Sequence, residues 1–87
     1  MKVKENFMLR KVADSYVVVP VGRQTLDFNG IINLNETGAF LFELLQKGAS
    51  RDELVEKLLA EYEVERDRAQ ADVDKFIQSV KDADVLE

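Results

Sequence analysis

The side chains that could do chemistry in this sequence are mainly carboxylates and hydroxyls, because the chain contains neither histidine nor cysteine. The serines at positions 15, 50 and 79 have no histidine to activate them as nucleophiles. Glu43 and Glu53 could serve as catalytic carboxylates, but acidic residues on helices of this composition are usually solvated. The sequence therefore predicts a protein that is not an enzyme, with no catalytic residue.

The carboxylates do not form a recognisable metal site either. Asp72 and Asp74 are two residues apart on an expected helix and point in different directions, as do Asp82 and Asp84. The sequence has no calcium-binding loop of the D-x-D-x-D-G type, and its four glycines are too dispersed for a phosphate-binding loop. We expect no bound metal and no cofactor.

The charged residues are unevenly distributed along the chain. The net charge of −5 divides into about +2 over residues 1–34 and about −7 over residues 35–87. One interpretation is a solvated acidic surface on the helices. The other is a basic sheet that favours an acidic partner. Composition and charge leave both interpretations open.

The first part of the chain is typical of a small antiparallel sheet of three or four strands. Phe7–Val12 is one strand, and Tyr16–Val19, which is β-branched and aromatic, is the strongest strand signal. Pro20 marks either the end of that strand or a sheet edge, because proline cannot donate to a ladder. Asn29-Gly30 predicts a hairpin turn between a short strand over the three residues before it and Ile31–Leu34.

The rest of the chain has helical periodicity. Asn35 is the expected N-cap of a first helix, which ends at Gly48. A capping box of the S-x-x-E form, Ser50 to Glu53, starts a second helix. A third helix begins after Glu65, a weak N-cap, and its apolar stripe is Ala69, Val73, Phe76, Ile77, Val80 and Ala83. We expect one α+β domain over residues 1–87, with a small N-terminal sheet followed by three helices.

This outline resembles a winged helix-turn-helix, an architecture often used on DNA. Residues 63–87, which include the would-be recognition helix, hold 8 acidic and 4 basic residues, and phosphates would repel such a helix. We therefore expect no nucleic-acid partner. The apolar runs are too short to cross a membrane and no secretory signal is visible, so the predicted location is the cytoplasm.

Protein binding is the remaining possibility, and the strand Ile31–Leu34 is its best candidate. If this strand lies at the edge of the sheet beside the third helix, an extended peptide could add a strand there. Ile32 and Leu34 project to the same side, so they could also be simple core residues. The two interpretations are compatible, because strand addition uses backbone groups.

The sequence resembles the PqqD family over nearly its whole length. The resemblance is carried by Leu9-Arg10, by residues 16–22 (YVVVPVG), by residues 29–39 (NGIINLNETGA) and by residues 54–62 (LVEKLLAEY), with Ala69 and Asp72-Val73 downstream. It implies a winged-helix-like peptide-recognition domain, known as a RiPP recognition element. Such domains bind the leader of a ribosomally made precursor peptide and deliver it to a modifying enzyme, often a radical S-adenosylmethionine protein.

The resemblance also implies where the leader would bind. In the family, the leader adds a strand beside the third strand and packs against the third helix, which correspond here to Ile31–Leu34 and to the segment Asp72–Val80. The residues from Val21 to Gly30 are longer than in proteins closest to the name-giving member, which fits the broader family rather than the quinone-cofactor pathway. The expected peptide-binding residues are Ile31, Ile32, Asn33, Leu34, Asp72, Val73, Lys75, Phe76, Ile77 and Ser79.

We therefore predict a non-catalytic adaptor or peptide chaperone, acting as a monomer or weak dimer. Its partners would be a precursor peptide and a radical SAM or other peptide-modifying enzyme. The alternative is a small winged-helix regulatory or structural interaction domain that has no precursor peptide.

Overall fold

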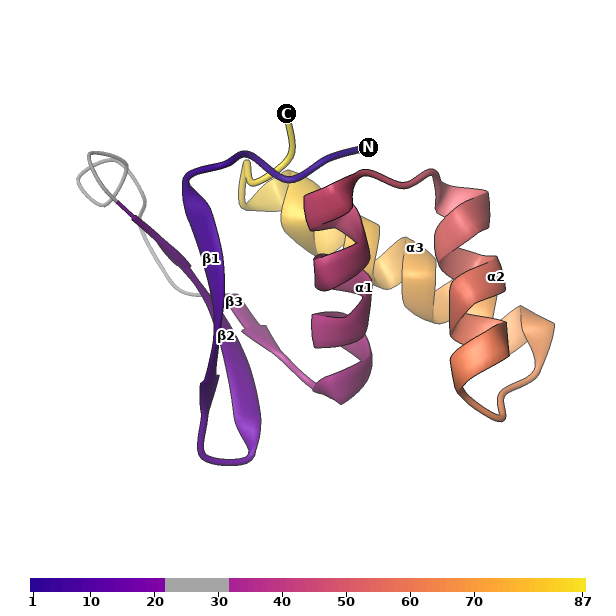
Figure 1. Ribbon diagram of the computed structural model, residues 1–87. Helices are drawn as coiled ribbons and strands as arrows, with labels where there is room; N and C mark the ends of the chain where they lie inside the picture. Colours follow the sequence, from indigo (N-terminus) through magenta and orange to yellow (C-terminus); the bar gives the residue numbers. More distant parts are fainter. Residues whose placement is uncertain (22–31) are drawn as a thin grey trace.

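The computed structural model describes residues 1–21 and 32–87 (Figure 1). In these residues three strands precede three helices, which confirms the predicted α+β fold class. The hairpin turn predicted at Asn29-Gly30, the short strand before it and Ile31 lie outside the described residues. None of the described helices is long and apolar enough to cross a membrane.

The described strands form one antiparallel sheet. Its strands are β1 (Phe7–Val12), β2 (Ser15–Pro20) and β3 (Ile32–Leu34), in the spatial order β1-β2-β3. A two-residue turn joins β1 to β2, and its first residue, Ala13, has a φ of 54°. Because β2 is central, β1 and β3 are the two edges of the described sheet.

Pro20 occupies the last position of β2, so the expectation that it ends this strand is confirmed. The next residue, Val21, donates its backbone N–H to the carbonyl of Asn6 over 2.8 Å. In an antiparallel strand, the backbone N–H and C=O groups of successive residues point alternately to one side of the strand and to the other. The missing N–H of Pro20 therefore faces away from β1 and costs no hydrogen bond in the β1–β2 ladder.

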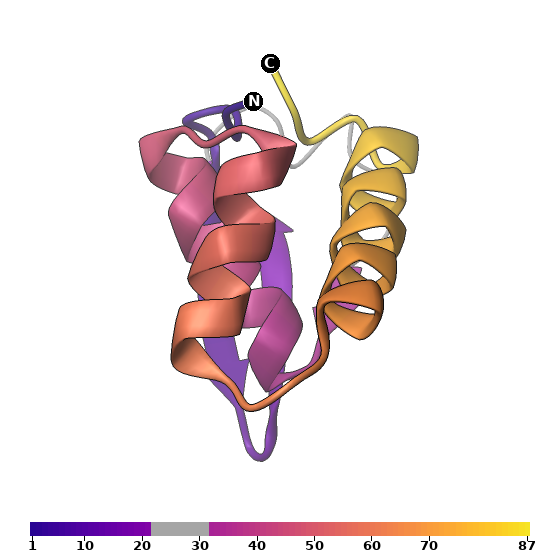
Figure 2. The same ribbon diagram turned by 90° about the vertical axis from the view of Figure 1, so that its right-hand side faces the viewer.

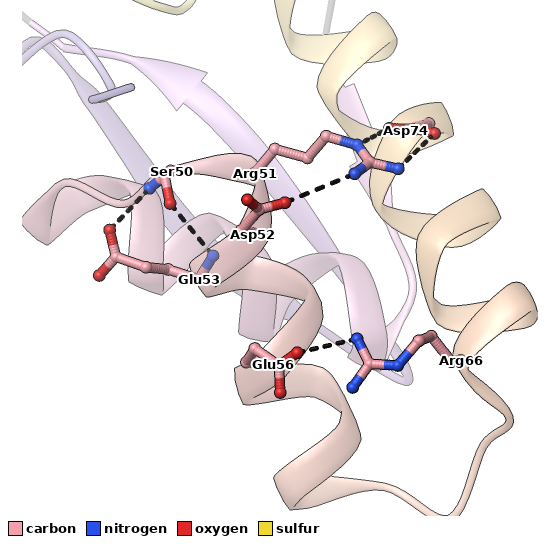
Figure 3. Close-up of polar contacts among 7 residues, drawn as sticks. All are labelled: Ser50, Arg51, Asp52, Glu53, Glu56, Arg66 and Asp74. Carbon is pink, nitrogen blue, oxygen red and sulfur yellow. Dashed lines mark hydrogen bonds and ion pairs between the residues drawn. The ribbon is translucent and has the colours of Figure 1, made fainter.

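The three helices begin and end close to where the sequence predicts. In α1 (Glu36–Lys47), the Asn35 side chain accepts the Gly38 N–H over 2.8 Å, and Gly48 follows the helix with a φ of 98°. In α2 (Arg51–Glu61), Ser50 and Glu53 form the predicted capping box (Figure 3). In α3 (Arg66–Asp82), Glu65 is the N-cap but makes no side-chain capping bond, as its poor capping chemistry predicts.

All three helices lie on one side of the sheet (Figure 1). A single apolar cluster fills the space between them, and no polar side chain of the described residues is buried in it. Burial of these side chains from water is the main favourable contribution to folding. The largest fully buried side chains are Val18, Leu41, Phe42, Leu45, Leu54, Leu58, Val73, Val80 and Val85.

The two ends of the chain are joined to each other, an arrangement that sequence periodicity did not reveal. Val3 and Leu86 form an antiparallel bridge, the Lys4 N–H donates to the carbonyl of Val85 and the Glu87 N–H donates to that of Lys2, both over 2.9 Å. Figure 2 shows both termini at the same end of the molecule. Val3 and Val85 are thereby buried in the core.

Ion pairs connect α2 to α3 on the surface (Figure 3). Arg51 donates from two nitrogens to the two carboxylate oxygens of Asp74, over 2.5 and 3.0 Å, and Arg66 donates to Glu56 over 2.8 Å. The hydrogen bond from Arg51, reinforced by its charge, lowers the pKa of Asp74 below its usual value. Because these side chains are solvated, each pair contributes modestly to stability.

The terminal bridge predicts a stability role for Val3, whose exposure is only 3%. Val3→Ala removes two buried methyl groups and should lower the free energy of unfolding by about 2 kcal/mol. Chemical denaturation measures this change. Val12→Ala is the matched control, because Val12 is 54% exposed, and it should change stability by about 0.5 kcal/mol or less. Equal effects of the two substitutions would contradict the packing of the N-terminal segment.

The Arg51–Asp74 pair predicts a pH dependence. A carboxylate whose pKa is lowered in the folded state adds stability above its unfolded-state pKa, about 3.9, and loses it as the pH falls through the folded-state value. Asp74→Asn should therefore destabilise the protein modestly at pH 7, and the difference from the parent should shrink as the pH falls below the unfolded-state value of about 3.9. Thermal unfolding across this pH range is the measurement.

Glu63→Gln provides a charge-matched control for that series. Glu63 lies between α2 and α3 and makes no ion pair with any described residue. A stability difference for Asp74→Asn that stays constant down to acid pH would show that the ion pair is not its source.

Candidate functional site

The register of the sheet shows which backbone groups of β3 face the side that no described strand covers. The hydrogen bond between Val21 and Asn6 fixes which residues of β2 direct their backbone N–H and C=O groups towards β1, because this direction alternates from residue to residue. Val17, four residues before Val21, therefore faces β1. Val17 is opposite Asn33 in the β2–β3 pairing. The backbone N–H and C=O of Asn33 therefore point away from β2, towards the edge on which no described strand lies, whereas those of Ile32 and Leu34 point towards β2.

A hollow of about 340 Å³ lies beside this open edge. It separates β3 and the first turn of α1 from α3, and we call it the β3–α3 groove. The Cα atoms of β3 and α3 nowhere approach within 8 Å of each other. The residues that line the groove are Asn33, Leu34, Asn35, Thr37, Gly38, Leu41, Arg68, Asp72, Lys75, Phe76 and Ser79.

The junction between β3 and α1 forms one wall of the groove. Only Asn35 separates the end of β3 from the start of α1. A Cβ atom at Gly38 would lie 3.1 Å from a methyl carbon of Leu34 and 3.3 Å from the Asn35 side-chain oxygen. The absence of a side chain at Gly38 thus lets the first turn of α1 lie against the last residue of β3.

The lining combines apolar and charged side chains. Leu34, Leu41 and Phe76 are buried members of the core cluster that also reach the groove. On α3, the Arg68 Nε contacts both carboxylate oxygens of Asp72 over 3.3 Å. Lys75, one turn further along the helix, is exposed. The groove therefore has an apolar interior with charged groups along its α3 side.

Catalytic groups are not gathered in this groove. Ser79 donates its hydroxyl to the carbonyl of Lys75, and Glu53, one of the two candidate carboxylates, caps α2 instead. No group of three side chains that could hold a metal ion occurs among the described residues. The described lining of the groove thus offers backbone, apolar and charged groups for contact with a ligand.

Comparison with known proteins identifies the family. The family model for coenzyme PQQ synthesis protein D (PqqD) matches residues 15–86. The chain belongs to the PqqD family. The resemblance seen in the sequence is thereby confirmed over most of its length. No curated protein matches the chain.

Two solved structures share the fold of this PqqD-family chain. One is TbiB1 in complex with the TbiA(beta) leader peptide, which is 24% identical with a TM-score of 0.77 and covers 100% of this chain and 95% of that chain. The other is lasso peptide synthetase B1 complexed with the leader peptide, which is 26% identical with a TM-score of 0.69 and covers 93% and 89%.

The structure brings six of the predicted peptide-binding residues into the groove lining. They are Asn33, Leu34, Asp72, Lys75, Phe76 and Ser79. Of the other four, Val73 and Ile77 are buried in the core, and Ile32 packs against the core from β3. The fourth, Ile31, lies outside the described residues. Whether any of the ten contacts a peptide stays a prediction.

Sequence reasoning missed five lining residues, namely Asn35, Thr37, Gly38, Leu41 and Arg68. For Arg68 a signal was present, because it precedes Asp72 by four residues and therefore lies on the same helix face. For the four residues around the start of α1, the signal would have been the single-residue junction with β3. That junction places the first helical turn beside the edge strand.

The junction predicts that the Asn35 cap supports the groove wall. Asn35→Ala removes the acceptor for the Gly38 N–H and should lower the free energy of unfolding by about 1 kcal/mol. Asn35→Ser, which keeps a capping oxygen, should lose much less. Urea unfolding of the two variants tests this, and equal stabilities would show that the cap contributes little.

Proposed function

We propose that this PqqD-family protein is a non-catalytic adaptor that binds the leader of a ribosomally synthesised precursor peptide. The leader would add a strand to the free edge of β3 and lie in the β3–α3 groove. It would thereby be presented to a peptide-modifying enzyme.

The observation that carries this proposal is the coincidence of an open strand edge with an adjacent hollow. The Asn33 backbone supplies a donor and an acceptor on the side where no described strand pairs with β3. A strand added to a sheet lies about 4.8 Å from its neighbour. The Cα atoms of β3 and α3 are more than 8 Å apart, and the β3–α3 groove, where such a strand would lie, is between them.

The comparisons support the same occupant. Both solved structures that share the fold are complexes with leader peptides. In β-strand addition the main-chain hydrogen bonds supply affinity and the neighbouring pockets supply selectivity. In this chain, the Asn33 backbone and the apolar interior formed by Leu34, Leu41 and Phe76 would fill these two roles.

The register also predicts how the peptide would be oriented. The peptide residue opposite Asn33 would turn its side chain away from the helices, and the residues on either side would turn theirs into the groove. A short segment with few anchoring side chains should bind with a Kd in the μM to sub-μM range, about −8 to −9 kcal/mol. Binding of this strength would raise the local concentration of precursor at an associated enzyme.

The partner enzyme in this proposal is a radical SAM or other peptide-modifying protein, and the adaptor acts in the cytoplasm as a monomer or weak dimer. The side chains that the structure describes form no recognised catalytic group, and this supports an adaptor rather than a catalyst. The family description names coenzyme PQQ synthesis, but the groove chemistry does not require that product. The proposal therefore covers precursor peptides generally.

The outward-facing backbone of Asn33 gives a direct test. Asn33→Pro removes the N–H that would pair with the peptide, while an edge strand tolerates proline where its N–H faces solvent. Affinity for a synthetic leader peptide, taken from a short open reading frame beside the gene, should fall about tenfold or more. Calorimetry or fluorescence anisotropy measures the affinity.

Asn33→Ala is the matched control, because it removes the same side chain and keeps the N–H. It should bind the leader peptide nearly as tightly as the parent does. If the folded Asn33→Pro and Asn33→Ala proteins bound the peptide equally well, β3 would not be the strand that pairs. Ile32→Pro, by contrast, should weaken the sheet itself, because the Ile32 N–H faces β2.

A further inference from the structure

The charges that line the β3–α3 groove differ in sign from those of the helices as a whole. Residues 35–87 carry about −7, but the groove lining holds two cations, Arg68 and Lys75, against one acid, Asp72. The local balance in the groove is therefore positive. An anionic group would be favoured there even though the molecule has a net charge of −5.

The three charged side chains are not equivalent. Arg68 is engaged with Asp72, whose side chain is only 35% exposed and whose two oxygens both face the Arg68 Nε. Asp72 is thus paired with its own helix neighbour. The Nζ of Lys75, in contrast, makes no ion pair or hydrogen bond with any described residue. Within residues 1–21 and 32–87, Lys75 is the groove-lining charge that has no counter-ion.

The other acidic residues of α3 do not supply that counter-ion. Asp74 is held by Arg51 of α2, and Asp82 accepts a hydrogen bond from Gln78. Asp67 does not line the groove. Glu36, in the first turn of α1, does not line the groove either.

We propose that the peptide bound in this groove carries an aspartate or glutamate on its groove-facing side, and that Lys75 binds that carboxylate. This assignment rests on the proposed peptide-binding function and adds the substrate class that the groove selects. Lys75 is then a specificity-determining residue, which distinguishes acidic peptides from neutral ones of the same shape.

Strand geometry fixes the spacing of the required peptide residues. Side chains that face one side of a strand recur at every second residue. The apolar side chain that contacts Leu34, Leu41 and Phe76 and the acidic side chain that contacts Lys75 must share the groove-facing side. The acidic residue therefore lies two, or another even number, of residues from the apolar one.

The expected effect is modest and measurable. An exposed ion pair contributes about 0.2–1 kcal/mol, which corresponds to a roughly 1.5- to fivefold change in Kd. The contribution should shrink as salt is added, because salt screens exposed charges. An uncharged peptide of the same sequence should lack this salt-sensitive part.

The experiment begins with selection of binders to the full chain from a displayed library of short random peptides. Enriched peptides should carry Asp or Glu at an even spacing from an apolar residue. One such peptide is then synthesised with its acidic residue as Glu, Gln or Lys, and its Kd is measured against the parent, Lys75→Gln and Lys75→Glu proteins. Lys81→Gln, on the same helix but outside the groove lining, controls for net charge.

The Glu peptide should bind the Lys75→Gln protein up to about fivefold more weakly than it binds the parent. It should bind the Lys81→Gln protein as tightly as it binds the parent. The Lys peptide should bind Lys75→Glu more tightly than it binds the parent. Thermal unfolding of each variant verifies that the protein is folded.

The outcomes separate this inference from the proposed function. If selected peptides bind and depend on the Asn33 N–H, but show no acidic enrichment or no response to Lys75→Gln and Lys75→Glu, the Lys75 assignment is overturned and the strand-addition function stands. If no selected peptide depends on Asn33, strand addition at β3 is itself overturned.

Discussion

The arrangement of this protein depends on the single residue that joins β3 to α1. Asn35 ends the strand and caps the helix at once, so the helix must begin against the edge of the sheet. Gly38 permits this approach, because a Cβ atom there would lie only 3.1 Å from a methyl carbon of Leu34. With one flank of β3 held by β2 and its end fixed by α1, the remaining flank faces α3 across the groove. A longer connection would let α1 start elsewhere and would leave the edge strand without a defined wall.

The distribution of charge separates this fold from the DNA-binding proteins that share its outline. The acidic side chains of α3 lie mainly outside the groove, where Asp74 pairs with Arg51 of α2 and Asp82 accepts a hydrogen bond from Gln78. They would oppose contact with phosphates along the face a recognition helix uses. The groove itself has a positive balance, so the same helix presents two surfaces of different sign. This division agrees with the family and fold matches, which do not favour the DNA-binding alternative.

Features set by neighbours in the chain could be predicted from the sequence. The Asn35 cap, the Ser50–Glu53 capping box and the Gly48 terminus each depend on residues within one helical turn. The order of strands and helices followed from their separate periodicities. The bridge between Val3 and Leu86 could not be predicted, because it joins segments more than eighty residues apart in sequence and has no local pattern.

The candidate site, too, could be predicted from the sequence only in part. The resemblance to the PqqD family pointed to Asp72, Lys75, Phe76 and Ser79 of the third helix, and all four line the groove. It also pointed to Val73 and Ile77, which are buried in the core, because a matching segment does not set how far a helix is rotated towards its neighbours. The direction of the Asn33 backbone required the register of two strand pairs, which only three-dimensional pairing provides.

The bridge between Val3 and Leu86 has a consequence for how this module can be combined with others. Two chain ends that run side by side are the geometry from which circular permutation and insertion into a host protein succeed. A short linker between Glu87 and Met1 would leave the register of the bridge intact. The domain could therefore be grafted into a surface loop of an enzyme by its paired ends, with the groove still open to a passing chain.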